Sequence, residues 1–326
     1  NTQNSMEVSK YAIQAKGTSS FDLRDYITIH VKNQMQTQSC WTYPLITGVE
    51  TNISLTRGYP SPIFSTRHME YATAKTFLDG INKNGYNREV GSGGNNIIGL
   101  SYFTSGLGPV LEKDMPFQNS EEKVNLSEIN KLAGQKIEQY IQFPSIYKEI
   151  TNRRITYKDN KGNILTSNQV NEIRNRIKEH VTTYGGVTAQ TNSSQTQYFN
   201  NVLPTLSTSY FCDDSNIIQD HVVTIIGWDD NYSKDNFTGA CKPSQDGAWL
   251  ILNSYGTGLN RGYYYISYED VMAERDMTGL ITVADRDYKN LYQYDILAQN
   301  IRYEPTLKNA EETKIPVASA YVANVY

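Results

Sequence analysis

The sequence contains few of the residues that build metal centres. Its 326 residues include only three cysteines, Cys40, Cys212 and Cys241, and four histidines. A structural zinc site needs paired ligands at CxxC or HxxxH spacing, and these seven residues are scattered along the chain. The sequence therefore excludes the zinc-ribbon class.

An excess of one charge and a long apolar run are also lacking. Lys and Arg number 30 against 34 Asp and Glu, which gives a formal net charge of −4 and a pI near 5.7. Nucleic acids and anionic membranes need a basic face, so we expect neither as the main partner. No stretch approaches 18 uncharged apolar residues, which excludes a membrane-spanning helix. With a mean hydropathy of −0.55, we expect a globular monomer with a polar surface.

An odd number of cysteines leaves at least one thiol unpaired in a monomer. Cys212 and Cys241 lie in polar loops beside the apolar segment 221–228, so they could form a disulfide and leave Cys40 free. The alternative is two independent thiols, and the loop context does not decide between them.

Apolar spacing predicts helices in the first part of the chain. The segment from Cys40 to Gly58 has apolar residues every three or four positions and ends with a glycine, which predicts a helix. We expect Ser39 to cap this helix and Cys40 to lie in its first turn. Further helices are predicted at 66–78, 96–104 and 126–141. The segment 168–186 also has apolar residues at helical spacing, and this helix is expected to end at Gly185-Gly186.

Strands are predicted in the second part. The segments 221–228, 247–256 and 262–270 are rich in β-branched and aromatic residues and are bounded by turn residues. Helices followed by strands predict an α+β protein with two lobes. Short β-like pieces continue over 284–326.

One cysteine, one histidine and one asparagine could form a catalytic group. A thiol attacks a carbonyl as the thiolate, and a helix N-terminus or a nearby imidazolium promotes that form. Cys40 is predicted at a helix start, and His221 could supply the imidazolium from a strand in the other half. Asn253 could then orient the imidazole. Each residue alone is weak support, because single buried cysteines and histidines are more often structural.

Three separated segments, in this order, resemble the papain family of cysteine proteases. They are VKNQMQTQSCW at 31–41, DHVVTIIGW at 220–228 and GAWLILNSYGTGLNRGYYYIS at 247–267. The resemblance covers roughly residues 21–270. It implies a papain-like two-lobe fold, with a helical left lobe, an antiparallel β-barrel-like right lobe and the active-site cleft between them.

The resemblance also implies roles for individual residues. Cys40 would be the nucleophile, His221 the general base and acid, and Asn253 the residue that orients the imidazole. Gln34, six positions before the cysteine, would supply an oxyanion donor. The alternative for Gln34 is a surface glutamine in a glutamine-rich loop.

Substrate-binding positions follow from the same resemblance. Gly93 and Gly94 match the family's glycine pair, whose backbone hydrogen-bonds an extended substrate like an added strand. Asn95 and Asn96 follow this pair, and Gln190 aligns with a pocket wall that is usually apolar. We therefore expect the second subsite to tolerate polar or small side chains.

The sequence departs from the family pattern at several positions. Thr37 and Gly91 replace the two cysteines of a family disulfide, so both partners of that bridge are absent together. Met35 replaces a glycine beside the oxyanion glutamine. Tyr255 replaces the tryptophan that normally shields the histidine–asparagine hydrogen bond, and the aromatic ring is kept.

An acidic loop separates the histidine strand from the asparagine strand. Its oxygens, on Asp229, Asp230, Asn231 and Asp235, hint at calcium, but the loop lacks the DxDxDG order and a closing glutamate. We favour a solvated loop and expect no cofactor.

Three more segments, GPVLEKDMPF at 108–117, GWDDNYSKDNF at 227–237 and YQYD at 292–295, resemble a bacterial branch of the family that includes clostridial surface-layer cysteine proteases. This resemblance divides the chain into an arm or propeptide remnant at 1–20, a peptidase domain at 21–283 and a β-rich extension at 284–326. That extension would be the start of a lectin-like domain. We expect a secreted or cell-surface location, with the protein's own propeptide and extended peptides as partners.

The leading hypothesis is a cysteine endopeptidase that acts through a thioester acyl-enzyme. One alternative is a Cys-His cell-wall amidase on a papain-like core, which would need neither Gln34 nor Asn253. Another is a non-catalytic adhesin, whose activity would survive alkylation of Cys40.

Overall fold

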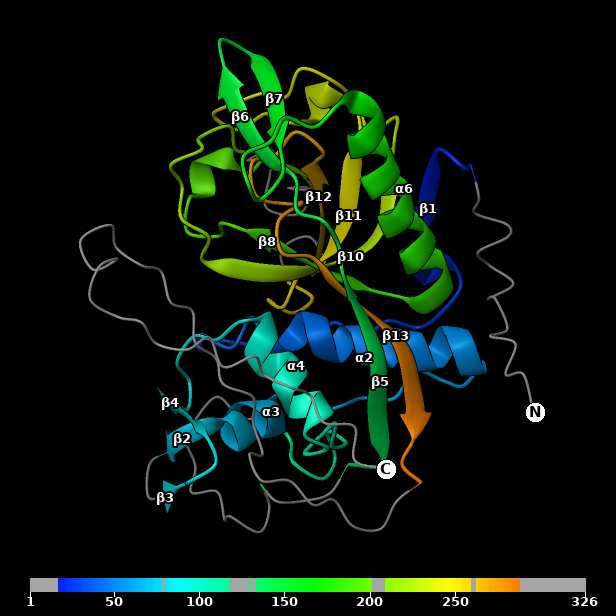
Figure 1. The fold of residues 1–326 in the computed structure, drawn as a ribbon, viewed down its shortest axis with the longest axis vertical. Coiled ribbons are helices and arrows are strands. Elements are labelled where there is room, and N and C mark those ends of the chain that lie inside the picture. The colour runs from blue at the N-terminus through cyan, green and yellow to red at the C-terminus, as the bar shows by residue number, and fades with distance from the viewer. Residues whose placement is uncertain are drawn as a thin grey trace.

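The computed structural model describes residues 17–77, 80–117, 129, 133–200, 209–258 and 262–287. Its chain forms two lobes, a helical lobe below and a sheet lobe above in Figure 1. The helices are α2 (Thr42–Arg57), α3 (Thr66–Thr73), α4 (Asn96–Thr104) and α6 (Ser167–Tyr184). Within these ranges no helix combines the length and the apolar character needed to cross a membrane.

The helical lobe is built around α2, and its helix ends follow local chemistry. Gly58 ends α2 in the left-handed region, as predicted. Ser65 and Asn95 cap α3 and α4, because each side chain accepts the backbone N–H three residues later. The prediction of Ser39 as a cap for α2 is wrong. This helix starts after Trp41 without a side-chain cap, and the Ser39 hydroxyl lies 2.5 Å from that of Thr37.

The predicted helix at 66–78 is only partly correct. It ends at Thr73, and the chain continues as strand β2 (Ala74–Phe77), which pairs with β3 (Gly80–Ile81) and β4 (Tyr86–Glu89). The side-chain amide of Asn82 donates a hydrogen bond to the carbonyl of Ala72 at 3.0 Å. Residues 74–77 leave the helical conformation because they pair with β3 and β4 in this small sheet.

The predicted helix at 126–141 is wrong at its end. Residues 118–128 and 130–132 lie outside the described residues, but Gln135–Gln142 forms strand β5. Ile137 and Ile141 have helical spacing, yet β5 pairs along its length with β13 (Thr278–Asp285). This partner is far away in sequence, so local periodicity could not reveal it.

The sheet lobe contains one long open sheet. Its strands follow the order β5-β13-β8-β10-β11-β12-β9, and β1 pairs beside β10. The remaining bounds are β1 (Ser20–Asp22), β8 (Val187–Thr191), β9 (Ser209–Tyr210), β10 (His221–Asp229), β11 (Ala248–Leu252) and β12 (Tyr263–Ser267). A hairpin of β6 (Tyr147–Thr151) and β7 (Arg154–Lys158) and three short 3-10 turns at 23–25, 196–198 and 234–236 accompany the sheet. The two-lobe α+β arrangement is therefore confirmed, while the sheet is not closed into a barrel and β9 pairs parallel to β12.

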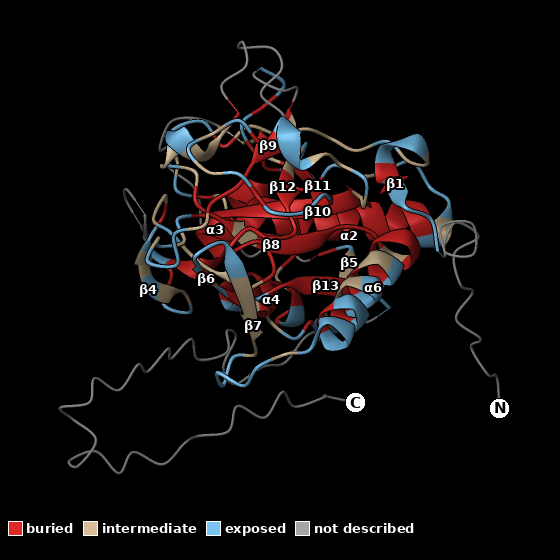
Figure 2. Cartoon of the chain, turned by 90° about the horizontal axis from the view of Figure 1, so that it is seen from above, coloured by how far each residue is buried: buried red, intermediate tan, exposed pale blue. Residues whose placement is uncertain are grey.

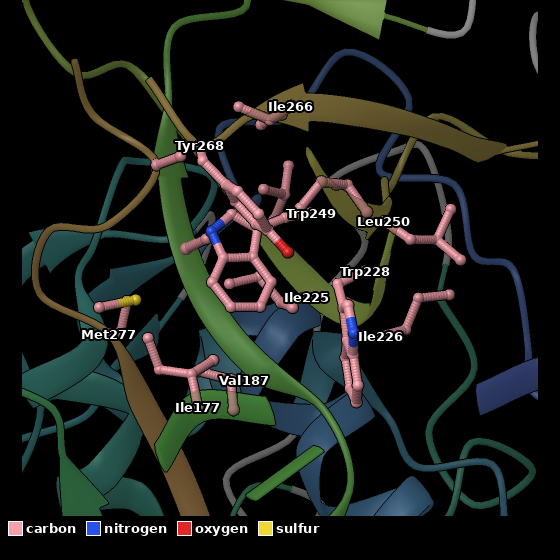
Figure 3. Close-up of a cluster of buried hydrophobic side chains, with 14 of the residues drawn as sticks. Ile177, Val187, Ile225, Ile226, Trp228, Trp249, Leu250, Ile266, Tyr268 and Met277 are labelled. Atoms are coloured by element: carbon pink, nitrogen blue, oxygen red, sulfur yellow. The ribbon is translucent and has the colours of Figure 1, made fainter. Parts of the chain in front are cut away.

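Each lobe has its own hydrophobic core. In the sheet lobe, Trp249 is fully buried and donates its indole N–H to Glu274 at 3.1 Å, among the side chains shown in Figure 3. In the helical lobe, Trp41 is fully buried among residues of α2, α3 and α4. Figure 2 shows α2, β10 and β11 among the buried elements at the centre of the molecule, and every residue of β11 is buried.

Two polar side chains of α2 hold the lobes together. Thr51 accepts the backbone N–H of Gly186 at 2.9 Å, and Asn52 donates to the carbonyls of Leu280 and Ile281 in β13. Gly185 has φ +102° and lies so close to Thr51 that a Cβ would sit 2.4 Å from its hydroxyl. This turn at Gly185-Gly186, where the helix before it was expected to end, therefore fixes α2 against the sheet lobe.

The two predicted chain extensions lie mostly outside the described residues. Residues 1–16 and 288–326 are not described, while β13 extends to Asp285. Pairing with β10 starts before Phe21, because the carbonyl of Ser19 accepts the N–H of Asp230 at 2.7 Å.

Candidate active site

Cys40 lies in a turn directly before α2, rather than in its first helical turn. The backbone N–H and the hydroxyl of Thr42 both donate to the carbonyl of Ser39 at 2.9 Å, which closes the turn around Cys40. The cysteine is therefore next to the N-terminal end of a 16-residue helix, where the helix dipole favours negative charge.

The sulfur of Cys40 contacts the start of β10 from the other lobe. Its Sγ lies 4.0 Å from the carbonyl oxygen of Asp220, although the two residues are 180 positions apart. Burial raises the pKa of the Cys40 thiol, and backbone N–H groups of Val222 and Trp41 oppose this rise. Burial is the larger effect, so the thiol is favoured over the thiolate in this arrangement.

His221 is the first residue of β10 and is almost completely buried. Its Nε2 lies 2.8 Å from Oδ1 of Asn253, which follows β11. An amide oxygen is an acceptor, so Nε2 carries a proton and the neutral ring keeps Nδ1 as its acceptor. Burial lowers the pKa of His221. The hydrogen bond with Asn253 and the charge of Asp220 oppose this change, but burial has the larger effect.

The ring of Tyr255 covers this pair. It stacks on the His221 ring with centroids 4.9 Å apart and planes 20° apart. The Tyr255 side chain is about half exposed, so it shields one face of the imidazole from water. The aromatic shield expected at this position is therefore in contact with the histidine.

The structure brings Cys40, His221 and Asn253 to one place, but only the last two are hydrogen-bonded. The sulfur meets the backbone on both sides of His221, at Asp220 and Val222, and no hydrogen bond joins it to the imidazole among the described residues. Burial favours the neutral form of both groups.

Gln34 is buried, so the surface-glutamine alternative is wrong. Its Nε2 donates to the carbonyl of Thr37 at 2.8 Å, and its Oε1 accepts the hydroxyl of Ser254 at 2.5 Å. Its backbone N–H also donates to the carbonyl of Ser254 at 2.7 Å. The amide group has two N–H donors, and only one is used by Thr37. Gln34 is therefore fixed to the residue next to Asn253, and the second N–H of its amide has no partner in the described part of the chain.

The glycine pair behaves differently at its two positions. A Cβ on Gly94 would lie 2.4 Å from the ring of Trp41, so only glycine allows this close packing. At Gly93, a built Cβ would have only Gln38 Oε1 within 4 Å. The backbone groups of both glycines make no hydrogen bond to the described part of the chain. They are available to an added strand.

The expected subsite residues form a polar group. The Asn95 oxygen accepts the N–H of Ile98, which occupies it as a helix cap. Gln190 donates to a carboxylate oxygen of Asp276 at 2.8 Å, and Asn96 donates to the Asp276 carbonyl at 3.0 Å. Sequence reasoning missed Asp276, because it comes 86 positions after Gln190 and no motif marks it.

Two other expectations concern groups away from this site. Cys212 and Cys241 are free thiols in the structure, so the disulfide considered above is not formed. Cys241 instead lies 2.8 Å from the Asp213 carboxylate, and burial raises its pKa to about 11. In the acidic loop, Asp230 accepts from Lys178 and Tyr268, and no grouping of ligands for a metal ion is found within the described ranges.

Comparisons with known proteins agree with this geometry. A family model described as papain family cysteine protease matches residues 17–280. No curated protein matches the chain. Among solved structures, a variant of the clostridial cysteine protease Cwp84 after propeptide cleavage has 26% identity and a TM-score of 0.65, over 86% of this chain and 62% of that chain.

Two further structures give similar information. The cysteine protease and lectin-like domains of Cwp84, a surface layer associated protein of Clostridium difficile, have 25% identity and a TM-score of 0.66, over 90% of this chain and 57% of that chain. The chain thus spans about three fifths of the Cwp84 chains. Bromelain from Ananas comosus, in complex with the E64 inhibitor, has 16% identity and a TM-score of 0.52, over 81% of this chain and 98% of that chain, and supports the fold alone.

Proposed function

The chain belongs to the papain family of cysteine proteases, and on that premise we propose that it is an endopeptidase that cleaves proteins through a thioester acyl-enzyme. The observation that carries this proposal is the contact of Cys40 with the backbone around His221, whose ring is bonded to Asn253. No metal or organic cofactor is required, but Cys40 must remain reduced.

In the acylation step, Cys40 attacks the carbonyl carbon of the scissile peptide bond. The thiol proton moves to Nδ1 of His221, which is the acceptor nitrogen because Nε2 donates to Asn253. Since burial favours the neutral thiol and the neutral imidazole, we place this proton transfer at or just before the attack. The imidazolium then protonates the leaving amine, and the thioester remains on Cys40.

In the deacylation step, water attacks the thioester. His221 accepts a proton from the water and returns it to the sulfur as the carboxylic acid leaves. In both steps, negative charge develops on the carbonyl oxygen. We propose that the unused N–H of Gln34 and the backbone N–H of Cys40 stabilise this charge.

The substrate is proposed to be an extended peptide that pairs with the backbone of Gly93 and Gly94. Beside this pair, the polar group of Asn96, Gln190 and Asp276 supports a second subsite that accepts polar or small side chains. A fluorogenic peptide library tests this, with Gln190→Leu as the variant expected to shift the preference toward Leu and Phe. A wild-type profile already dominated by Leu and Phe would contradict it.

Location and natural substrate rest on similarity to Cwp84. Because that protein is surface-layer associated, we propose a secreted or cell-surface location and bacterial surface proteins as substrates. Cwp84 also occurs in a form from which a propeptide has been cleaved, which supports the proposal that residues 1–20 include a propeptide remnant.

A peptide-library digest tests the activity. The wild type is expected to cleave within extended peptides, and Cys40→Ala is expected to cleave none. Cys241→Ala is the matched control, because the Cys241 thiol is also free but contacts the Asp213 carboxylate instead of the backbone around His221. Full cleavage by Cys40→Ala would refute the proposal. Activity on peptidoglycan peptides that survives Gln34→Ala and Asn253→Ala would favour the amidase.

A further inference from the structure

The loop that carries the glycine pair has no covalent link to the segment before Cys40. Thr37 and Gly91 stand at the two ends of the bridge that the family would have there. The backbone N–H of Gln38 donates to the carbonyl of Gly91 at 3.3 Å, which is a long hydrogen bond. A single contact of this kind is a weak anchor for a loop that must bind substrate.

Arg88, near the end of β4, makes the stronger connection. Its side chain is 8% exposed, and its Nη2 donates to the carbonyl of Ser92 at 2.6 Å. Its Nη1 donates to the carbonyl of Glu70 at 3.1 Å and lies 3.3 Å from the hydroxyl of Thr73. One guanidinium therefore joins the last turn of α3 to the residue directly before Gly93.

Two further contacts extend this connection toward the nucleophile. The carboxylate of Glu70 lies 3.8 Å from Arg88 and accepts the backbone N–H of Gly91 at 3.1 Å. The guanidinium carbon of Arg88 lies 5.1 Å from the centre of the Trp41 ring. Gly94 packs on the same ring, and Trp41 is the residue after Cys40.

We propose that Arg88 is a positioning residue for peptide binding: it holds residues 91–94 against Trp41, so that Gly93 and Gly94 meet the substrate backbone at a fixed distance from Cys40. This inference rests on the endopeptidase function proposed above. Arg88 takes no part in proton transfer, because its contacts are with the loop, α3 and Trp41. Its planar group makes several directed bonds at once, which neither lysine nor a neutral side chain can reproduce.

The test compares Arg88→Met with wild type on two substrates. A long peptide occupies the glycine pair, whereas a short acyl ester does not reach it. For the long peptide we expect KM to rise about tenfold with kcat within about twofold, which corresponds to one lost hydrogen bond. The short ester is expected to show no change. Arg88→Lys should give a smaller rise in KM, because lysine can bond one carbonyl.

Arg57→Met is the matched control. Arg57 is another partly buried arginine of the helical lobe, and it donates to Asp285 and to the carbonyl of Val283 at the far end of α2. Its loss should leave the KM values for both substrates unchanged. The proposal would be overturned if Arg88→Met lost the same factor in kcat/KM on the long and the short substrate. It would also be overturned if Arg57→Met raised the KM for the long peptide as much as Arg88→Met does.

A measurement without substrate separates this proposal from the proposed activity. Amide hydrogen exchange of residues 89–96 should be faster in Arg88→Met and in Arg88→Lys than in wild type. If wild type cleaves no peptide, the endopeptidase function fails, and unchanged exchange in a folded Arg88 variant refutes the positioning role separately. Should Arg88→Met not fold, Arg88→Lys carries both measurements.

Discussion

The burial of His180 predicts that the free energy of unfolding falls in acid. It lies on the buried side of α6, with its Nε2 unpaired within the described residues and its ring edge-on to Phe143 at 5.5 Å. Burial lowers its pKa from 6.5 to about 3. Because burial opposes the charge, protonated His180 is favoured only in the unfolded chain.

The sign and the size of this effect follow from the two pKa values. A lowered pKa in the folded state leaves stability unaffected above pH 6.5 and reduces it as the pH falls from 6.5 toward about 3. At pH 5 the unfolded histidine is almost fully protonated while the folded one is neutral. The difference is about 2 kcal/mol at about 1.4 kcal/mol for each pH unit.

The variant His180→Phe removes the titration and keeps a ring beside Phe143. Urea unfolding of both proteins at pH 7 and pH 5 measures the change in unfolding free energy. We expect wild type to lose about 2 kcal/mol more than the variant between these pH values. The two proteins are compared by the change in unfolding free energy between pH 7 and pH 5, because repacking around the new ring shifts the variant's unfolding free energy equally at both pH values.

Ile177→Val is the control for this experiment. Ile177 lies in the same helix and is fully buried, so its truncation costs about 1 kcal/mol without a titrating group. It should therefore lose as much stability as wild type on going to pH 5. If His180→Phe also loses as much as wild type, the ring is not the source of acid sensitivity and the reasoning is refuted.

Three further predictions concern the proposed catalytic residues. First, His221→Ala should nearly abolish kcat/KM, whereas Asn253→Ala should reduce it less, because orientation contributes less than the base itself; equal losses in steady-state assays would contradict this. Second, Gln34→Ala should lower kcat about 10²–10³-fold with intact folding, and a change in KM alone would exclude an oxyanion role. Third, in His221→Ala the rate of Cys40 alkylation by iodoacetamide should rise with pH. The midpoint of that rise, which is the thiol pKa, should lie above the ordinary value of about 8.5, because burial raises the pKa of this thiol. A midpoint below about 8 would show that the helix end has the larger effect on the thiol pKa.

The sequence predicted those parts of the structure that depend on local chemistry. The glycine end of α2 at Gly58, helix α4 and the strands of the second half follow from spacing and turn residues. It also brought Cys40, His221 and Asn253 into one hypothesis, because three motifs in order carry information that a single residue does not. Burial of Gln34 could not be predicted, since its partner Ser254 is 220 positions away.

Errors occurred where distant partners decide the local structure. Residues 135–142 have a helical apolar spacing but form strand β5, which pairs with β13. The end of α3 coincides with the pairing of residues 74–77 with β3 and β4, which follow later in the chain. Asp276 and Arg88 also carry no motif, and their importance is visible only in the contacts they make across the fold.

The two lobes are interlocked by the opposite ends of the peptidase chain. Strand β1, near the start, pairs with β10 in the sheet lobe, while β13, near the end, lies along α2 of the helical lobe. Neither lobe can be completed from a continuous piece of sequence, so assembly requires contacts such as that of Asn52 with Leu280, 228 residues apart. During synthesis, Cys40 can therefore meet His221 only after strand β10 has left the ribosome, so the proposed nucleophile and its proposed base come together late in folding.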